Sequence, residues 1–437
     1  MKPTRKQSSV PSTRLGRAVR LGMMAGEVAL DGALSSMRQL ASGRRPTAAN
    51  WLSARNAETL ARRLSTLRGA AMKLGQMLSL QEDLLPPEFR QALALLRSEG
   101  YAMPSAQLHR MLGREYGAGW QRRFDTFDDE PIAAASIGQV HRARTRDGRD
   151  LALKIQYPGV ARSIDSDVDN MATLLRWLDF LPVELDVAGL AAEAKRQLKV
   201  EADYLQEADH AERFARLLRS APGIVVPRVH RDFTTRRILA LDFIDSEPLE
   251  DLAGEDVPQR TRDGIARRIE DLMFRELFEF RLMQTDPNPA NYRYRRSTDS
   301  LVLLDFGSTL EIDEERVDGY REICRAVIAD DRQAIYRAAI RLGYLRDDTP
   351  ADSAAGVLEI IGLVCLPLAH RGAYDFGASR LAQHTLDLGV EVAFRQGLPT
   401  PPASTMFLHR KLVGTFMLCA MLRARIDVHR LVVPHLA

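Results

Sequence analysis

The sequence predicts an α+β protein with two lobes, a small one that carries an antiparallel sheet and a larger helical one. The first observation is the stretch 122–157, where apolar and polar residues alternate around a turn at Asp147 and Gly148, a pattern typical of strands and a hairpin. The second is the mainly helical pattern from about residue 260 onward. The third is the joint between the two patterns, at residues 242–247. A chain of 437 residues is long enough for both lobes and a helical extension before them.

The composition narrows the class of function. The 61 Lys and Arg residues nearly balance the 58 Asp and Glu residues, so the charge does not indicate a nucleic-acid partner. The three cysteines lie far apart and fit neither a disulfide framework nor a metal site. No segment reaches the roughly 20 apolar residues of a membrane-spanning helix, and residues 355–369 are better explained as a buried core helix. We expect a cytoplasmic protein, with a peripheral contact to the inner membrane as an open alternative.

The first 120 residues predict a leader and helices. Residues 1–50 combine a basic start, which fits either an organelle transit peptide or a disordered leader, with an amphipathic helix that packs on the protein or binds a membrane surface. Residues 51–120 predict a helical extension, whose last helix is capped by Ser105. Lys73 and Gln76 share one helical face among small residues. Taken alone, they are most simply side chains that reach out to solvent.

The predicted N-lobe, residues 121–245, begins with three strands. The segment PIAAASIGQV (131–140) between the first two occupies the place of a phosphate-binding loop, with its centre at Ala133, Ala134, Ala135 and Ser136. Alanines make such a loop stiffer than glycines would, and only Gly138 allows positive φ. The alternative is a plain turn. Helices at 164–180 and 187–219 follow, the second very long, and IVVPRVH and RRILALDFI then predict a further strand pair.

Lys154 lies on the third strand, in the apolar stretch LALKIQ of a chain with only seven lysines. This context is typical of a lysine that binds the α- and β-phosphates of a nucleotide. Because a buried lysine without a counter-charge is unfavourable, an acid must accompany it. The long helix offers four candidates, namely Glu193, Glu201, Asp203 and Glu207. The alternative is an edge-strand lysine that reaches solvent.

The predicted C-lobe, residues 246–437, contains MQTDPNPANYRYRRSTDSLVLLDFGS (283–308). Asp286 precedes Asn291 by five residues, and Asp305 follows Asn291 by fourteen, at the end of an apolar strand. Phosphoryl transfer needs one carboxylate at the acceptor, and an Asn and a second Asp to hold Mg²⁺. The spacing therefore predicts a kinase-type phosphoryl-transfer site that holds Mg²⁺ on the phosphates of a nucleotide. The backbone around Asp242 and Ile244, at the expected hinge between the lobes, would bind adenine. Turn residues that cap local backbone are the alternative.

Five motifs in this order carry a resemblance to a known family: KLGQ at 73–76, AAAS at 133–136, EADYLQEA at 201–208, QTDPNPAN at 284–291 and DFG at 305–307. Together they resemble the UbiB/AarF atypical kinase-like family, nearest to its coenzyme Q biosynthesis branch, which the phrase LHRKLVGTFMLCAMLRAR (408–425) also resembles. The resemblance implies a two-lobed protein-kinase-like fold with the N-terminal helical extension covering the cleft.

The resemblance also implies roles for residues. Lys73 and Gln76 would gate the site, with Lys73 near Glu201 and Asp203, while Glu207 would pair with Lys154. Residues two apart lie about 200° around a regular helix, so either one of the two acids dominates the contact or the helix is distorted.

The expected function is that of an MgATP-binding atypical kinase or ATPase that supports ubiquinone biosynthesis. Asp286 would orient or deprotonate the acceptor, which is water or a small-molecule or lipid hydroxyl. The alternative is a nucleotide-sensing scaffold for ubiquinone-biosynthesis enzymes. An ordinary protein kinase is disfavoured, because the helix predicted soon after Gly307 leaves little room for a segment that docks protein substrates. Candidate partners are an adenine nucleotide, a lipid or membrane surface, those enzymes, and a second copy of the chain in a homodimer; no nucleic acid is expected.

Overall fold

The computed structural model describes residues 103–177, 187–254, 256–381, 384, 385, 388 and 403–436. They form two compact units. Unit 1 holds the described residues up to Ala208 together with Val229–Phe243, and unit 2 holds Asp209–Arg228 and the chain from Ile244 onward. Lys73 and Gln76, and with them the gating contact predicted for Lys73, lie outside the described residues.

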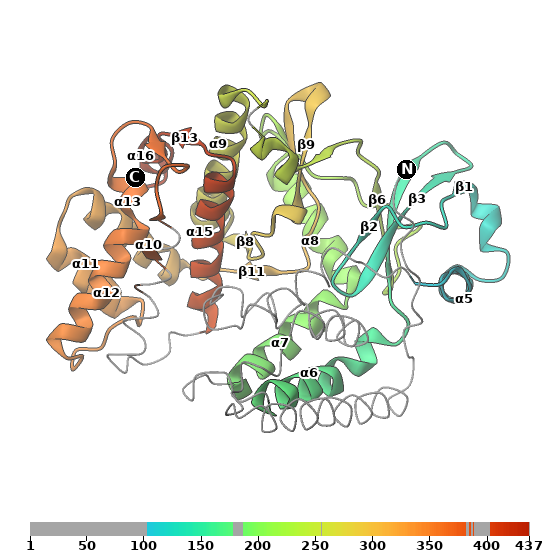
Figure 1. Ribbon diagram of the computed structural model, residues 1–437, viewed down its shortest axis with the longest axis horizontal. Coiled ribbons are helices and arrows are strands. Elements are labelled where there is room, and N and C mark those ends of the chain that lie inside the picture. The colour runs from blue at the N-terminus through green and yellow to red at the C-terminus, as the bar shows by residue number, and fades with distance from the viewer. Residues whose placement is uncertain are drawn as a thin grey trace, which may run out of the picture. The chain divides into compact units, whose positions relative to one another are not determined.

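Unit 1 is built around an antiparallel sheet with strand order β1-β3-β4-β6, in which β2 also pairs with β3 (Figure 1). The strands are β1 (Phe124–Phe127), β2 (Ala133–Ala134), β3 (Gly138–Thr145), β4 (Asp150–Gln156) and β6 (Ile238–Asp242). Leu151, Leu153 and Ile155 of β4 are fully buried, so the alternation of a strand turns Lys154 to the other face. Gly148, at φ 87°, makes the turn between β3 and β4, and the predicted hairpin is confirmed.

Within the described residues of unit 1, two helices precede the sheet in the sequence, and three lie between β4 and β6. They are α5 (Ser105–Tyr116), the short η4 (Trp120–Arg123), α6 (Val160–Trp177), α7 (Val187–Glu201) and α8 (Tyr204–Leu217), the last of which continues into unit 2. The prediction that Ser105 caps α5 is wrong. Pro104 occupies the cap position, with φ −56° and ψ 140°, and no side chain caps the helix. Since proline fixes φ near this value, it starts a helix without a capping hydroxyl.

The predicted long helix over 187–219 is interrupted. α7 ends at Glu201 and α8 begins at Tyr204, because the Asp203 carboxylate accepts hydrogen bonds from the backbone N–H groups of Leu205 (3.1 Å) and Gln206 (3.4 Å). A carboxylate that accepts from the second and third amides of a helix is an N-cap. The break releases Glu201 and Asp203 from the angular relation they would have on one helix.

The segment IVVPRVH does not form one strand. Its first residues, β5 (Ile224–Val225), pair in parallel with β10 (Ser300–Leu303) in unit 2. Past Pro227, Val229 forms an isolated bridge with Leu241 of β6. Since proline lacks an amide hydrogen, it ends the first pairing, and the chain then joins a different sheet. The predicted strand pair is thus correct only for the bridge to β6.

Unit 2 contains a four-stranded sheet of order β5-β10-β9-β7 and a set of helices. The other two strands of this sheet are β7 (Glu247–Pro248) and β9 (Tyr292–Arg295). Two further strand pairs of unit 2 are β8 (Leu282–Gln284) with β11 (Thr309–Glu311), and β12 (Tyr374–Asp375) with β13 (Arg425–Ile426). Its α-helices are α9 (Gln259–Arg275), α10 (Glu314–Ile328), α11 (Arg332–Arg341), α12 (Ala351–Val364), α13 (Leu366–Ala369), α15 (Ala403–Met421) and α16 (Val428–Val432). Short turns of helix are η5 (Leu249–Ala253), the π-helical η6 (Glu276–Phe280), η7 (Pro289–Asn291), η8 (Arg296–Thr298) and η9 (Val433–Leu436).

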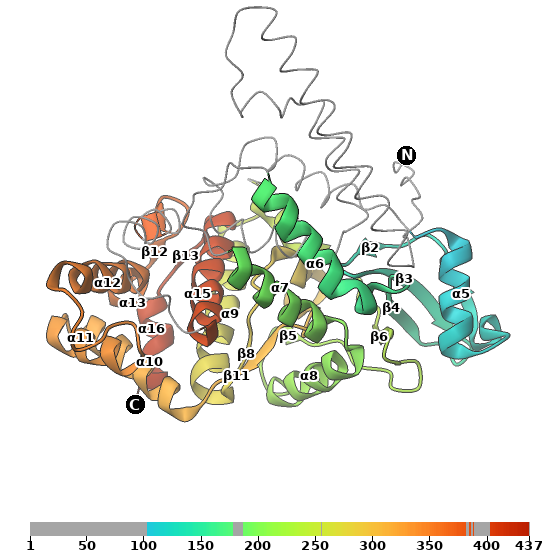
Figure 2. The same cartoon turned by 90° about the horizontal axis from the view of Figure 1, so that it is seen from below.

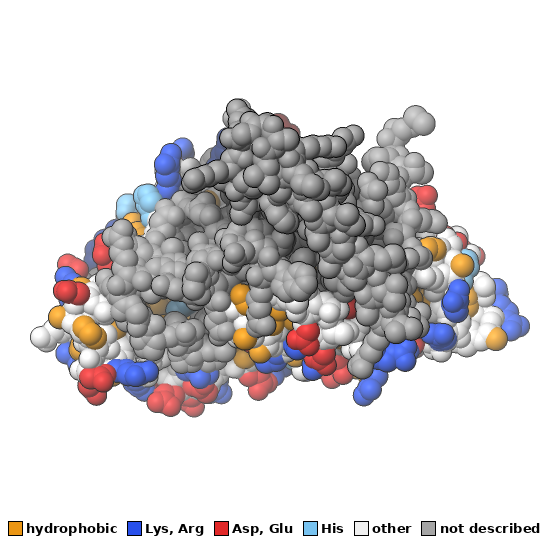
Figure 3. Space-filling view, turned by 60° about the horizontal axis from the view of Figure 1, so that its bottom comes forward, with side chains coloured by type: hydrophobic (Ala, Val, Ile, Leu, Met, Phe, Trp, Pro, Cys, Tyr) orange, Lys and Arg blue, Asp and Glu red, His pale blue; other side chains and the backbone are white. Residues whose placement is uncertain are grey.

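Two details of unit 2 bear on the sequence patterns. Strand β9 follows Asn291 directly and pairs with β10. The apolar segment 355–369 forms parts of α12 and α13 and breaks at Cys365, next to Pro367 in the first turn of α13. Among the described residues, none of the helices combines the length and apolar character that crossing a bilayer would require. On the face in Figure 3, acidic and basic side chains lie interspersed over the described surface.

The interior of unit 2 holds charged groups. α15 runs beside α9 (Figures 1 and 2), and the Lys411 ammonium of α15 lies 2.9 Å from Glu276 Oε2, with both side chains at most 2% exposed. Burial lowers the pKa of Lys411, but the Glu276 carboxylate beside it raises that pKa above its ordinary value. Glu270 of α9 is fully buried and accepts a hydrogen bond from the Cys419 thiol at 3.4 Å. Burial raises the pKa of Glu270 to about 8.

We expect Glu270 to make the stability of the protein depend on pH. Its folded-state pKa of about 8 exceeds the ordinary 4.5, so the folded protein keeps a proton that the unfolded chain releases. The contribution of this proton to stability is complete below pH 4.5 and is lost as the pH rises to about 8, at about 1.4 kcal/mol per pH unit. Glu270→Gln should flatten this part of the profile in urea unfolding from pH 5 to 8. An unchanged slope would contradict the assignment, and Glu250→Gln, at an exposed position, is the matched control.

Candidate active site

Unit 1 brings Lys154 and Glu207 together. Lys154 Nζ donates to Glu207 Oε1 at 2.7 Å and Oε2 at 3.0 Å. The glutamate side chain is 1% exposed and the lysine side chain 15% exposed. The carboxylate is therefore shielded from solvent, whereas the lysine remains partly accessible. The Tyr204 ring lies 5.2 Å from the ammonium. Of the four acids considered for Lys154, this is the one that the resemblance implied.

The position of Glu207 follows from the helix break. With Asp203 as the N-cap, Glu207 lies in the first turn of α8, where the helix dipole favours a negative charge. The cap therefore explains why the chain places a buried carboxylate there. It also assigns Asp203 a local structural role, beside the gating role that stays a prediction.

The alanine-rich segment of unit 1 forms a short hairpin. Ala133 and Ala134 make β2, paired with Val140 and Gln139 of β3, and both are exposed. The Ser136 hydroxyl donates to Glu201 Oε2 at 3.0 Å, which links the predicted phosphate loop to the end of α7. The sequence showed no sign of this contact. Phosphate binding by residues 133–136 stays a prediction.

Gly138 is required for a steric reason. It is not among the positive-φ residues, so it does not use the left-handed backbone that glycine allows. A Cβ at this position would overlap the Ile155 carbonyl oxygen and lie 3.1 Å from the Tyr204 hydroxyl. Glycine is thus needed because β3, β4 and α8 approach one another closely there.

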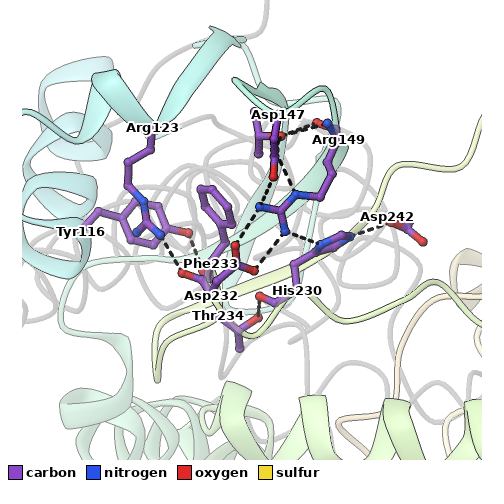
Figure 4. A network of polar contacts seen from close by, with 10 residues as sticks. Tyr116, Arg123, Asp147, Arg149, His230, Asp232, Phe233, Thr234 and Asp242 are labelled. Carbon is purple, nitrogen blue, oxygen red and sulfur yellow. Dashed lines mark hydrogen bonds and ion pairs between the residues drawn. The ribbon is translucent and has the colours of Figure 1, made fainter.

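The predicted hinge residue Asp242 belongs to a polar network within unit 1 (Figure 4). His230 Nε2 lies 2.7 Å from Asp242 Oδ1, and Nδ1 of the same ring lies 3.1 Å from Arg149 Nη1. Since a guanidinium only donates, Nδ1 accepts and Nε2 carries the hydrogen that Asp242 receives. Arg149 also forms a bidentate pair with Asp232, at 3.1 and 2.8 Å. The network fixes the end of β6; adenine contacts at Asp242 and Ile244 stay a prediction.

Unit 2 brings Asp286, Asn291 and the start of the DFG motif together. Asn291 Nδ2 donates to the Asp286 backbone oxygen at 2.9 Å and to its Oδ2 at 3.1 Å. The Leu304 N–H, one residue before Asp305, donates to the Asn291 carbonyl at 3.0 Å. Strands β8 and β11 join the two segments a second time, through Gln284 and Thr309. Residues far apart in the sequence therefore meet at this loop.

The DFG motif is stabilised by a hydrogen bond within the motif and by contacts with α8. Asp305 Oδ1 accepts from the Gly307 N–H at 2.9 Å. Phe306 is 1% exposed, its ring lies 5.0 Å from that of Phe214, and its carbonyl accepts from His210 Nδ1 at 3.2 Å. Burial lowers the pKa of His210, which favours the neutral ring. Neither His210 nor Phe214 was predicted, because packing partners on another helix leave no local signal.

Helix α10 begins soon after the motif, as expected. Asp313, six residues beyond Gly307, caps α10 by accepting from the Arg316 N–H, and only the short β11 lies between. The segment in which many kinases bind protein substrates has little length here.

Two basic residues of α15 beside this part of the chain were missed. Arg410 Nη2 lies 2.5 Å from Asp286 Oδ1, and Lys411 Nζ lies 3.3 Å from the Tyr292 hydroxyl, next to Asn291. A signal for Lys411 was available, since it is one of seven lysines and is flanked by an apolar run. Arg410 had none, because arginine is common in this chain.

The donor set of this loop fits Mg²⁺. Magnesium prefers oxygen ligands and usually keeps several waters, with one or two protein groups and substrate phosphates completing the shell. The Asn291 amide nitrogen is engaged by Asp286, so its Oδ1 is the end that suits a cation, and Asp305 supplies a carboxylate. Within the described ranges, no cluster of three or more His, Cys, Asp or Glu could hold a metal by itself.

Comparisons with known proteins agree with this arrangement. Residues 95–339 match the ABC1 atypical kinase-like domain. The chain is 38% identical to the rat mitochondrial atypical kinase COQ8B over 96% of its length and 80% of that protein. It is 34% identical to the mitochondrial atypical kinase COQ8 of Saccharomyces cerevisiae, over 98% of its length and 86% of that protein.

A solved structure resembles the fold. It is Rv3197 of Mycobacterium tuberculosis in complex with erythromycin, with a TM-score of 0.59 and 24% identity over 86% of this chain and 94% of that one. The likeness concerns the fold alone. With the domain match, it confirms the predicted α+β, kinase-like fold.

We expect Lys154→Met to destabilise the protein by about 3 kcal/mol, because it leaves the buried Glu207 carboxylate without its counter-charge. In urea unfolding, Lys154→Met/Glu207→Gln should lose less than the sum of the single variants. Additive losses would show that the two side chains do not depend on each other. Lys195→Met is the matched control, since Lys195 pairs with an Asp169 that is 62% exposed, and should cost less than about 1 kcal/mol.

Proposed function

Because the chain belongs to the ABC1 atypical kinase-like family, we propose that it binds MgATP and transfers or hydrolyses the γ-phosphate. The observation that carries the proposal is the loop of unit 2, where Asn291 bonds to Asp286 and to the strand end before Asp305. In this proposal Asp286 is the carboxylate on the acceptor side, and Asn291 and Asp305 are the two oxygen ligands for a cation. Phosphoryl transfer requires this combination, since catalysis there is mostly positioning and charge stabilisation.

Each residue has a part in the proposal. Lys154, held in place by Glu207, binds the α- and β-phosphates, and the backbone of Ala133, Ala134, Ala135 and Ser136 covers them. Asn291 and Asp305 hold magnesium, which neutralises charge on the phosphates when bound. Asp286 orients the acceptor hydroxyl or water. Adenine binds the backbone at Asp242 and Ile244. Lys73 and Gln76, outside the described residues, gate access together with Glu201 and Asp203.

The relatives suggest the biological setting. Two of them are named as mitochondrial atypical kinases of the COQ8 type, and the motifs resemble the coenzyme Q branch of the family. We therefore propose that the chain supports ubiquinone biosynthesis and that its acceptor is water or a small-molecule or lipid hydroxyl. Contacts with a lipid surface, with ubiquinone-biosynthesis enzymes or with a second copy of the chain belong to the same proposal. The cytoplasmic location expected from the sequence stays a prediction beside the mitochondrial names of these relatives.

One observation favours a second candidate. Both carboxylate oxygens of Asp286 already have partners, Arg410 on Oδ1 and Asn291 on Oδ2. A carboxylate engaged in this way has fewer free lone pairs with which to bind an acceptor hydroxyl, which suits a protein that senses nucleotide and organises other enzymes with little turnover.

Turnover of ATP separates the two candidates. The wild-type protein should convert labelled ATP to ADP above the buffer rate in the presence of membranes, and Asp286→Asn should lower kcat on the order of 100-fold. Asp330→Asn should keep the wild-type rate, because Asp330 is exposed and its φ of 54° suits asparagine. If the wild-type protein turns over no ATP above buffer, the enzyme proposal is wrong and the scaffold candidate remains.

Asp305→Asn tests the metal site without turnover. MgATP at about 100 times its Kd should stabilise the wild-type protein by about 2.7 kcal/mol, seen as a raised thermal midpoint. The variant should lose the part of this shift that depends on magnesium, because the amide carries no charge for the cation. A magnesium-dependent shift equal to that of the wild-type protein would remove Asp305 from the metal site. Asp330→Asn again serves as the control.

A further inference from the structure

We propose that Arg410 of α15 is a positioning residue that fixes the orientation of the Asp286 carboxylate. The inference rests on the proposed function, in which Asp286 orients the acceptor. Arg410 Nη2 lies 2.5 Å from Asp286 Oδ1, and the two side chains are 11% and 19% exposed. Their separation in sequence, 124 residues, means that the contact depends on how α15 packs within unit 2.

The loop holds the same carboxylate from its other side. Asn291 Nδ2 donates to Oδ2 at 3.1 Å, and the Asp286 backbone oxygen accepts from Gln284 Nε2 at 2.9 Å as well as from Asn291. With one oxygen tied to the loop and the other to α15, rotation of the carboxylate breaks at least one charge-assisted hydrogen bond. Arg410 therefore supplies the part of the restraint that the loop cannot provide by itself.

The neighbours of Arg410 fix the rotation of α15. Successive helix residues point about 100° apart, so His409, Arg410 and Lys411 face three directions. His409 Nε2 lies 2.5 Å from the Tyr344 hydroxyl, Arg410 meets Asp286, and Lys411 meets Glu276 at 2.9 Å. A turn of the helix that freed Arg410 would also break two largely buried polar contacts. The triplet therefore sets the direction of the guanidinium.

Close packing fixes the distance between α15 and the loop. Gly414 lies one helical turn beyond Arg410, on the same face. A Cβ at position 414 would overlap Pro287 Cγ and lie 2.7 Å from Pro287 Cβ. The helix thus touches the residue directly after Asp286, which brings Arg410 within reach of the carboxylate.

The chemistry of arginine suits positioning. Its planar guanidinium stays charged and holds a carboxylate in a defined direction, whereas a lysine ammonium is a point charge on a flexible stem. Because phosphoryl transfer depends on how the acceptor lies relative to the phosphate, a small misplacement of Asp286 should slow the reaction more than it weakens nucleotide binding.

The test compares kcat with nucleotide binding. Arg410→Ala should lower kcat for ATP on the order of 10- to 100-fold, while KM for ATP and the MgATP-induced rise of the thermal midpoint stay within about twofold of the wild-type values. Millimolar guanidinium should restore part of kcat in Arg410→Ala, and Arg410→Lys should retain more activity than Arg410→Ala. Arg430→Ala, at an exposed position on α16, is the matched control and should behave as the wild-type protein.

Two results would overturn the proposal: kcat of Arg410→Ala within twofold of the wild-type value, or a loss that neither guanidinium nor Arg410→Lys relieves. A measurement without turnover keeps the proposed function separate. The thermal midpoints of Asp286→Asn, Arg410→Met and the double variant should be non-additive, because the two side chains share one contact. If the wild-type protein does not turn over ATP, the proposed function fails, and additive midpoints would still reject the pairing on their own.

Discussion

The buried ion pair between Lys411 and Glu276 is the constraint on which the arrangement of unit 2 depends. Both charged side chains are at most 2% exposed. Because the protein interior solvates a charge poorly, removing either partner would leave the other unpaired at a large cost in stability. The pair ties α15 to η6, directly before β8 and the loop of Asp286. About two helical turns further along α15, Cys419 donates a hydrogen bond to Glu270 of α9. The helix therefore has one permitted rotation, and the direction of Arg410 follows from it.

Unit 1 also contains a charged pair, Lys154 with Glu207, but here the lysine is partly exposed to solvent. The ammonium is therefore held in place by the carboxylate and is still partly accessible. The carboxylate owes its place to a helix cap: Asp203 ends one helix and starts the next, and Glu207 falls in the first turn of α8. The absence of a side chain at Gly138 allows β3 to pack closely against β4 and Tyr204. Within each unit, a buried acid fixes a basic side chain; in unit 1 the lysine is proposed to bind phosphate, and in unit 2 the lysine orients a helix.

The predictions from sequence succeeded where the signal was local. Alternation predicted β3, β4 and the turn at Gly148, and the apolar run before Asp305 predicted β10. They failed where a single residue ended an element locally, or where contacts between distant residues determined the structure. Hydrophobic periodicity predicts one continuous helix, but the carboxylate of Asp203 caps a new helix and so interrupts it. One strand is predicted for 224–230, but on either side of Pro227 the chain pairs with two different sheets. The need for glycine at position 138 comes from the close approach of β3, β4 and Tyr204, which φ preferences do not describe.

By itself, the sequence determined the family, the kinase-like fold class and the residue types of the candidate site, because motif spacing is a property of the chain. It could not determine which groups surround those residues. That Ser136 meets Glu201, that His210 holds the backbone of the DFG motif, and that Arg410 meets Asp286 were decided by tertiary packing. The physical reason is that hydrogen bonds and ion pairs between distant residues depend on the rotation and spacing of helices. Those are set by buried side chains acting together, and no short stretch of sequence records them.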